Sequence, residues 1–379
     1  MFNLITIAFG LITPLFALVL IPVIRNKKSL SLLFAAILTS GMIFFQPLPG
    51  FDLLVHYQNF MSYQEGAYDL FNRYIGVDIL IYIITGLGLS KNTLVFVTSF
   101  LLFYSSLKFV ENKVHSNNIF MVFTLIVLSY PLVLLISGVR FSIALSFFLM
   151  LDVNFYKKRF VLSALSGLFA IIFHYAFAPL IGVYFLFKLL RLNRINTKLL
   201  FYFLLFIFPL VFYQEFMIKI ISILVEYLGV EKYVGLDLSR YVSGDWGAMR
   251  SAHYNLNGLV GYFLPKILLC LLGFVYLITS KQQDSFIIGL FTIVILLFNF
   301  GDIGDRYAIC LIPFLITASL KEKAEITINK FPLCLLFIVT FVFINVIKEW
   351  VLYGEVYMGI LTSTLFLNSP LLVLFSEGI

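Results

Sequence analysis

The chain has 379 residues, of which 61% are hydrophobic and 12% are charged, and its formal net charge is +7. A soluble domain usually carries about 25% charged residues. The composition therefore excludes an ordinary soluble enzyme and predicts an all-α polytopic membrane protein, organised as a single integral membrane domain over residues 1–379. The basic residues form short clusters between apolar runs, a pattern that orients membrane helices and is not typical of a nucleic-acid-binding surface.

Apolar runs along the chain predict about twelve transmembrane helices (roughly 10–13), because one crossing takes about 20 apolar residues. Several runs are shorter than this, which indicates tilted or half-spanning helices around a cavity. The first run is long enough to span and no basic segment precedes it, so we expect no cleaved signal peptide. The expected spans lie near residues 4–24, 29–48, 93–112, 119–139, 141–155, 160–174, 175–190, 199–213, 258–279, 285–301, 306–320 and 331–350.

The orientation of these helices follows from the basic clusters. The first cluster, Arg25–Lys28, follows the first apolar run and is expected in the cytoplasm. The later clusters share that side only if residues 49–92 form an interfacial or re-entrant segment on the outer face. This topology places two large loops outside, residues 49–92 and 214–257. Most acidic residues then lie outside and most basic residues inside.

Arg140 interrupts an apolar run over residues 119–155, and a basic turn, Lys157–Arg159, follows. Burying a guanidinium in hydrocarbon is costly, so an arginine at this depth usually faces a water-filled cavity or an anionic partner. The planar guanidinium of an arginine suits bidentate binding of phosphate or carboxylate. The alternative is a structural ion pair with an acid on a neighbouring helix, such as Asp302.

Two more polar interruptions reach the outer side in this topology. His174, at the tip of a helical hairpin, either contacts a diphosphate or shuttles a proton, or it simply caps a helix. The sequence GDIGDRY predicts a tight connecting turn at its glycines. It supplies Arg306 as a second phosphate clamp, Asp302 and Asp305 as candidate general bases, and Tyr307 as a sugar contact. In the alternative reading, its acidic and basic side chains only neutralise each other.

The outer loops supply candidate sugar-binding residues. Asp52, His56 and Tyr57 share one face of a short helix, where the acid is a candidate general base and the other two contact sugar. An amphipathic helix lying among lipid headgroups has the same pattern. The second loop mixes acids, bases and aromatics, as both carbohydrate sites and ordinary solvated loops do. The candidates there and in the next span are Arg240, Trp246, Arg250, His253, Tyr254 and Lys266; the lysine alternatively extends to the interface.

The chain lacks the spacings that typify metal sites and glycine-rich phosphate loops, so we expect neither a metal nor another cofactor. Without nucleotide-binding motifs, an activated lipid is the expected energy source. Cys270, Cys310 and Cys334 lie in apolar runs without C-x-x-C spacing. They are predicted to be buried free thiols.

The order of these motifs resembles the EpsG-like and Wzy-type polysaccharide (O-antigen) polymerases. The resemblance is carried by Gly50, Asp52 and Tyr57, by GVRFSIALSFFLM around Arg140, by the basic turn, and by H-x-A at His174. The arginine segment of that family usually reads R-Q-x-x-A. Here Phe141 replaces the glutamine, and Ala144 keeps the alanine.

The resemblance implies a metal-independent glycosyltransferase of GT-C-like architecture in the bacterial inner membrane. It would transfer a glycan from undecaprenyl diphosphate to the non-reducing end of another lipid-linked repeat unit. Arg140, Arg306 and His174 would stabilise the leaving diphosphate. One of Asp52, Asp302, Asp305 and His174 would take the acceptor proton.

A chain-length regulator and a flippase are the expected protein partners. Two other functions compete with the polymerase. A lipid-linked oligosaccharide flippase typically shows inverted repeats and polar positions at the bilayer midplane. An O-antigen ligase uses the same donor but transfers the glycan to the lipid A core.

Overall fold

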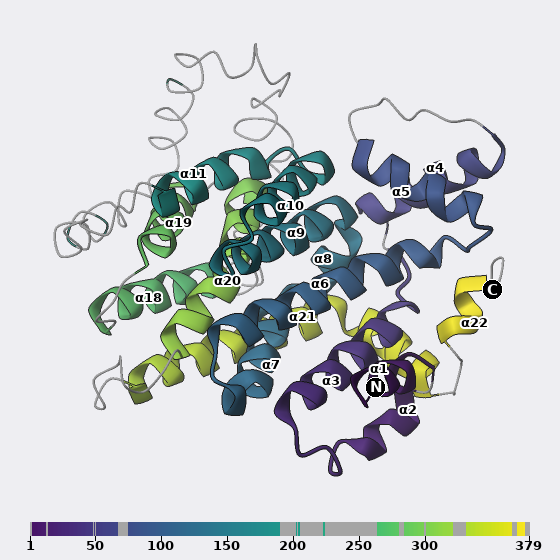
Figure 1. The fold of residues 1–379 in the computed structure, drawn as a ribbon, viewed down its shortest axis with the longest axis horizontal. Helices are drawn as coiled ribbons and strands as arrows, with labels where there is room; N and C mark the ends of the chain where they lie inside the picture. Colours follow the sequence, from purple (N-terminus) through teal and green to yellow (C-terminus); the bar gives the residue numbers. More distant parts are fainter. Residues whose placement is uncertain are drawn as a thin grey trace. The chain divides into compact units, whose positions relative to one another are not determined.

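Figure 1 shows the computed structural model of the chain. It describes residues 2–12, 14–47, 49, 51–66, 75–189, 264–279, 284–298, 301–320, 331–365 and 370–375, together with 202, 204 and 223. These residues form helices and turns, and none of them lies in a β-strand. The chain divides into two units, Met1–Ile181 with Glu349–Ile379 and Gly182–Lys348. Each unit is described by itself.

The first unit contains α1 (Phe2–Ile12), α2 (Pro14–Ala17), η1 (Leu18–Leu20), α3 (Lys27–Met42), α4 (Asp52–Gln64), α5 (Ile75–Gly86), α6 (Asn92–Lys113), η2 (Ser116–Asn118), α7 (Ile119–Ser129), α8 (Leu132–Ser137), α9 (Val139–Tyr156), α10 (Phe160–Phe173) and α22 (Pro370–Phe375). The second contains α18 (Leu264–Thr279), α19 (Ser285–Leu296) and α20 (Gly301–Leu320). Two helices belong partly to each unit, α11 (Phe177–Leu189) and α21 (Phe331–Leu365).

Within the part of the chain that the structure describes, three helical segments are long and apolar enough to cross a membrane, namely α6, α9 and the Cys334–Ser363 part of α21. Other apolar helices are shorter, such as α10 and α19 with 14 and 12 residues. The described chain therefore has the all-α membrane character that its composition predicts. The expected number of about twelve crossings stays a prediction, and the expected span at 199–213 lies almost entirely outside the described residues.

Two of the expected spans are not regular α-helix throughout. In the run at 4–24, the 3-10 helix η1 follows α2 at Leu18. The run at 119–139 is divided at Pro131 into α7 and α8. Proline has no backbone N–H and disfavours helical backbone in the residue before it, and Tyr130 is accordingly extended. In the run at 119–139, two helices therefore replace the single helix expected.

The GDIGDRY segment is also helical, and the predicted tight turn does not form. Gly301 begins α20, which continues to Leu320. A Cβ on Gly304 would collide with the carbonyl oxygen of Leu297, just after α19. The glycine therefore allows two backbones to approach each other inside the second unit, and the polar residues that follow occupy the first turns of α20.

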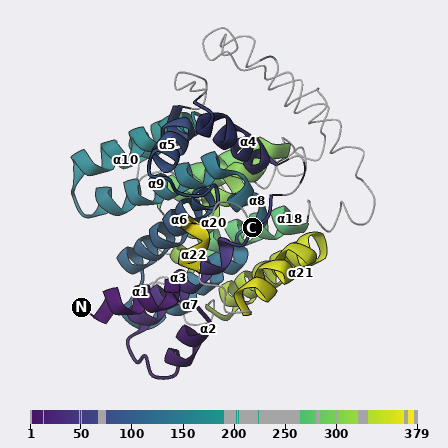
Figure 2. The same cartoon turned by 90° about the vertical axis from the view of Figure 1, so that its right-hand side faces the viewer.

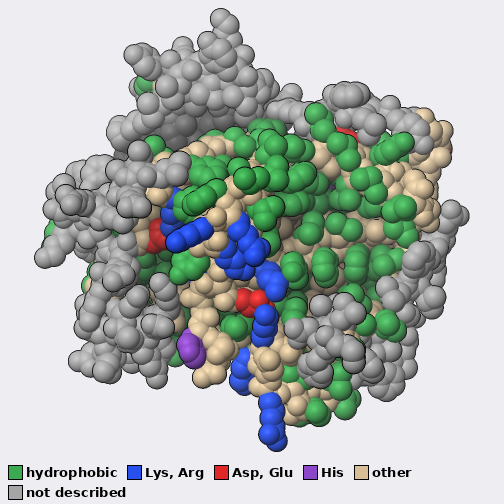
Figure 3. Space-filling view, in the orientation of Figure 1, with side chains coloured by type: hydrophobic (Ala, Val, Ile, Leu, Met, Phe, Trp, Pro, Cys, Tyr) green, Lys and Arg blue, Asp and Glu red, His purple; other side chains and the backbone are tan. Residues whose placement is uncertain are grey.

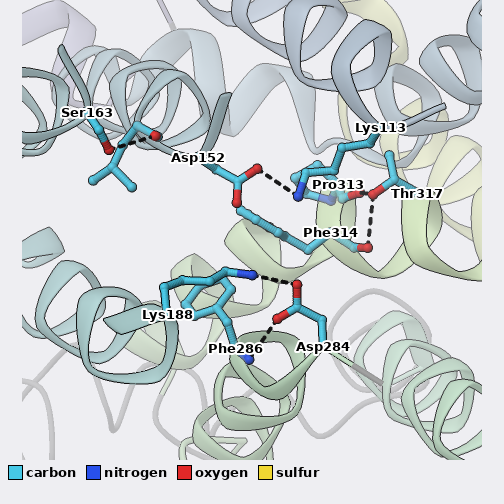
Figure 4. Close-up of polar contacts among 10 residues, drawn as sticks. Lys113, Asp152, Ser163, Lys188, Asp284, Phe286, Pro313, Phe314 and Thr317 are labelled. Atoms are coloured by element: carbon cyan, nitrogen blue, oxygen red, sulfur yellow. Dashed lines mark hydrogen bonds and ion pairs between the residues drawn. The ribbon is translucent and has the colours of Figure 1, made fainter. Parts of the chain in front are cut away.

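The first unit is built around α9, which packs along both α6 and α10 (Figure 1). Ser163 in α10 donates a hydrogen bond to the carbonyl of Leu151 in α9 over 2.9 Å (Figure 4). A Cβ on Gly167 would lie 3.0 Å from a methyl group of the same leucine. The other face of α10 exposes apolar side chains such as Val161, as expected for a helix that faces lipid.

One end of this helical group is basic. Glu111 near the end of α6 pairs with Lys108 at 3.0 Å and with Lys28 of α3 at 3.7 Å. Lys113 pairs with Asp152 near the end of α9 at 2.7 Å (Figure 4). The exposed turn Lys157–Arg159 follows directly. Lys and Arg side chains accordingly gather in a band in Figure 3, beside exposed hydrophobic ones.

The carboxyl-terminal helix α22 is tied to the start of α6. Ser90 donates its amide to Leu374 at 2.9 Å and its hydroxyl to Val373 at 2.8 Å. Figure 2 shows α22 beside α6 from a second direction. The helix α22 therefore belongs to the packing of the first unit.

Polar contacts also organise the second unit. Asp284 accepts the amide N–H of Phe286 at 3.0 Å and so caps α19. It also pairs with Lys188 of α11 at 2.6 Å (Figure 4). The three cysteines Cys270, Cys310 and Cys334 are buried and free, as the sequence predicts.

Candidate active site

The site begins with an ion pair between two helix starts. Arg140 is the second residue of α9, and Asp52 is the first residue of α4. Arg140 Nη2 donates to Asp52 Oδ2 over 2.6 Å. The arginine side chain is 18% exposed and the aspartate 42%, so the carboxylate is the more accessible partner. Arg140 therefore has an acidic partner on a neighbouring helix, and the partner that the structure describes is Asp52.

The bend between α8 and α9 places Arg140. The amide of Gly138 donates to the carbonyl of Leu134 over 2.8 Å and closes α8. A Cβ on Gly138 would lie 2.9 Å from that same oxygen, closer than real Cβ atoms approach. On the α9 side, the Ser142 hydroxyl donates to Leu135 over 2.5 Å. The local sequence thus fixes the turn that brings the arginine to the start of α9.

His56 is buried beside the ion pair. Its side chain is 3% exposed, and neither ring nitrogen has a hydrogen-bond partner among the described residues. Burial, reinforced by the charge of Arg140 and opposed by that of Asp52, lowers the pKa of His56 to about 4. The imidazole is therefore neutral at physiological pH. The predicted helical face places His56 against the protein interior, one turn from Asp52.

Tyr57, the third residue predicted on this face, is turned toward α6. Its hydroxyl donates to Asn92 Oδ1 over 3.0 Å, and Lys91 Nζ lies 5.4 Å from the centre of its ring. Burial raises its pKa, so the phenol stays protonated. Tyr57 therefore fixes α4 against the start of α6.

His174 has the geometry of a helix cap. It ends α10, is 8% exposed, and its Nδ1 accepts the amide N–H of Ala176 over 3.3 Å. Its ring meets Phe141 edge-on, with 6.0 Å between ring centres. His174 therefore packs against the residue that follows Arg140, in the position where the related family usually has glutamine.

Glu349 is a buried acid near this site that the sequence reading did not select. It is 6% exposed, and its Oε2 accepts the Tyr357 hydroxyl at 2.7 Å and the Val133 amide at 3.4 Å. Val133 lies at the start of α8. A carboxylate in the apolar run of α21 is the same kind of signal that identified Arg140.

The candidates in the second unit form a separate pair. Lys266 Nζ lies 2.5 Å from Asp305 Oδ1 and donates to the carbonyl of Phe298 over 3.2 Å. The lysine side chain is 15% exposed and the aspartate 23%. Arg306 and Tyr307 are partly buried in the following positions. The side chain of Asp302 lies outside the described residues, as do Arg240, Trp246, Arg250, His253 and Tyr254.

Among the described residues, no group of three or more His, Cys, Asp or Glu side chains is arranged to hold a metal ion. The expectation of a metal-independent site stays a prediction. What the first unit does hold is one cation and one partly exposed carboxylate in contact, with a neutral imidazole behind them. This arrangement suits binding of an anionic group together with proton transfer.

The sequence model of the EpsG family matches residues 30–358. No curated protein and no solved structure matches the chain. The matched residues make up most of the chain and include Asp52, His56, Arg140, His174 and Glu349. The resemblance drawn from the short motifs is confirmed at the level of the family: this chain belongs to the EpsG family.

Proposed function

We propose that this chain is a surface-polysaccharide (O-antigen) polymerase of the bacterial inner membrane. It transfers a growing glycan from undecaprenyl diphosphate to the non-reducing end of a second lipid-linked repeat unit, at the periplasmic face. The observation that carries the proposal is the Asp52–Arg140 ion pair within the residues matched by the EpsG family. In this pair, the guanidinium can bind a diphosphate and the carboxylate can accept a proton.

The location of the pair agrees with this proposal. Lys113 near the end of α6 pairs with Asp152 near the end of α9. Asn92 lies at the start of α6, and Arg140 lies at the start of α9. The 18 residues of α9 rise about 27 Å, close to the thickness of a bilayer core. If the basic end is cytoplasmic, as the positive-inside rule indicates, the ion pair lies at the outer side.

The reaction needs a base for the acceptor and stabilisation for the leaving group. The acceptor hydroxyl oxygen attacks the anomeric carbon, and the bond from that carbon to the diphosphate oxygen breaks. The electron pair of the broken bond leaves with the diphosphate, where Arg140 stabilises the developing charge. The acceptor proton passes to Asp52.

The ion pair links these two tasks. In the free protein the guanidinium neutralises the Asp52 carboxylate at 2.6 Å. When a diphosphate draws the guanidinium toward itself, the carboxylate loses its counter-ion and takes a proton more readily. Asp52 thus becomes an effective base only when the donor is in place, which guards against unproductive proton uptake.

The test is to delete the gene and complement it with wild type, with Arg140→Ala, or with Arg159→Ala. Arg159 is a matched control, because it is an exposed arginine at the opposite end of α9. A lipopolysaccharide or capsule gel should show the long-chain ladder for wild type and Arg159→Ala. Arg140→Ala should leave a single-repeat band at normal protein level.

The other outcomes separate the alternatives. A normal ladder in the deletion strain or with Arg140→Ala would reject the proposal. Loss of even the single-repeat band would favour a flippase or a ligase. In liposomes with lipid-linked repeat units, a polymerase lengthens the glycan, whereas a flippase only moves the lipid across the bilayer. A ligase reveals itself only when lipid A core is supplied as acceptor.

A further inference from the structure

Glu349 is an unusual residue for its surroundings. It lies within the apolar Cys334–Ser363 segment of α21, and its side chain is 6% exposed. A buried carboxylate in such a segment is costly unless it satisfies specific partners. By comparison, Glu355 in the same helix is exposed. The burial of Glu349 therefore reflects its contacts and not a general preference of this helix for acids.

The first contact of Glu349 is with α8. Its Oε2 accepts the amide N–H of Val133, in the first turn of that six-residue helix. The first amides of a helix have no partner inside the helix, so an external acceptor stabilises its start. The helix α8 packs against both α4 and α9. The Glu349 carboxylate therefore holds α8, which packs against the helix of Asp52 and the helix of Arg140.

A kink in α21 allows a second contact of Glu349 and brings Tyr353 against Phe51. Eight residues of regular helix would separate Glu349 from Tyr357 by about 12 Å along the axis. The backbone of Tyr353 is not helical (φ −135°, ψ 22°), and the Tyr357 hydroxyl reaches Glu349 Oε2 at 2.7 Å. At the kink, Tyr353 meets the ring of Phe51 edge-on, with 6.4 Å between centres. Phe51 is the residue directly before Asp52.

We propose that Glu349 is a positioning residue: with Tyr353 and Tyr357 it holds α8 and the start of α4 so that Arg140 and Asp52 meet. This role rests on the proposed polymerase function, because it acts through the same ion pair. This part of α21 contacts Val133 in α8, the helix before the one that carries Arg140. It also contacts Phe51, the residue before Asp52. The carboxylate itself takes no part in the chemical step.

The experiment uses the full-length protein in proteoliposomes, with undecaprenyl-diphosphate-linked repeat units from the deletion strain as substrate. Glu349→Gln keeps an acceptor oxygen for Val133 and Tyr357, and we expect it to retain most of the wild-type rate. Glu349→Ala removes the carboxylate that accepts from the Val133 amide and the Tyr357 hydroxyl, and we expect the rate to fall by about tenfold or more. The exposed control Glu355→Ala should polymerise like wild type.

A coupling measurement separates positioning from general packing. Each Glu349 variant is also made in an Arg140→Lys background that retains partial activity. Since Glu349 acts through Arg140, Glu349→Ala should lower the polymerisation rate by a smaller factor there than in the wild-type background. Substitution of a purely structural residue would lower the rate by the same factor in both backgrounds. Where Glu349→Ala gives too little protein, Tyr357→Phe removes a single hydroxyl and is tested in the same two backgrounds.

Three results would overturn the inference. The first is wild-type activity in Glu349→Ala. The second is equal inactivity of the Gln and Ala variants at normal protein level, which would mean that the charge of Glu349 takes part in the reaction. The third is an equal cost in both backgrounds. Failure of the proposed function looks different, because the ladder would then survive gene deletion or Arg140→Ala.

Discussion

Arg140 and Asp52 lie 88 positions apart in the chain, and their side chains meet at 2.6 Å. One stands at the start of a candidate membrane-spanning helix, and the other begins a short helix outside the candidate spans. Such a partly exposed pair contributes little to stability by itself. Its value lies in holding an accessible carboxylate next to a cation.

The first prediction concerns Asp52. Asp52→Asn should lower the rate of glycan transfer by about 10²–10⁴-fold, because the amide cannot take the acceptor proton. Single-turnover transfer in proteoliposomes measures this step directly. Glu65→Gln, at an exposed acid after the other end of α4, serves as the control and should leave the rate unchanged. A normal rate for Asp52→Asn would leave Asp52 as an anchor for Arg140 only.

The second prediction concerns the bend before Arg140. Gly138→Ala places a methyl group 2.9 Å from the Leu134 carbonyl oxygen, so the start of α9 must shift. We expect at least about tenfold lower polymerase activity, since small misplacements of reacting groups are costly. Gly182→Ala is the control, because a Cβ there meets nothing within 4 Å. Equal activity of both variants would show that the bend has room for a side chain.

The third prediction is a pH dependence of stability. Unfolding exposes His56, which then titrates near 6.5, whereas the folded protein resists protonation until about pH 4. The unfolded state therefore binds more protons as the pH falls from 7 to 4, and the free energy of unfolding should drop by roughly 3 kcal/mol. Thermal unfolding in detergent across this range measures the drop. His56→Gln should flatten the curve, and His115→Gln, at an exposed histidine, should not.

The fourth prediction concerns the second unit. Asp305→Asn leaves Lys266 without its counter-ion and should destabilise the protein by about 1–2 kcal/mol, since both side chains keep some exposure. Lys266→Met with Asp305→Leu removes both charges and should regain much of that loss. Thermal unfolding of the single and double variants gives the coupling. Additive losses would show that the pair is not energetically coupled.

Part of the site was accessible from sequence. An arginine within an apolar run is costly enough to mark a position of interest, and Asp52 was selected by its helical spacing with His56 and Tyr57. Glu349 carries the same signal as Arg140 but lies close to the expected end of a span, where a charge is unremarkable. Its burial depends on α8, which no local pattern reveals.

Other expectations failed for local reasons. The glycines of GDIGDRY suggested a turn, but Gly304 instead allows close contact with the Leu297 carbonyl inside a helical arrangement. Pro131 divides an apolar run that hydropathy reads as continuous, and this break creates the short helix that precedes Arg140. Hydropathy averages over a window, whereas a single missing N–H decides where a helix ends.

The sequence by itself determined the helical membrane class, the family and the buried state of the cysteines, because these depend on composition, local periodicity and short motifs. The tertiary structure alone decided which acid pairs with Arg140, because a side chain chooses its partner by distance and burial across elements far apart in the chain. It also decided that Glu349 joins α8 to the kink of α21, since hydrogen bonds over 216 positions leave no periodic trace in a sequence.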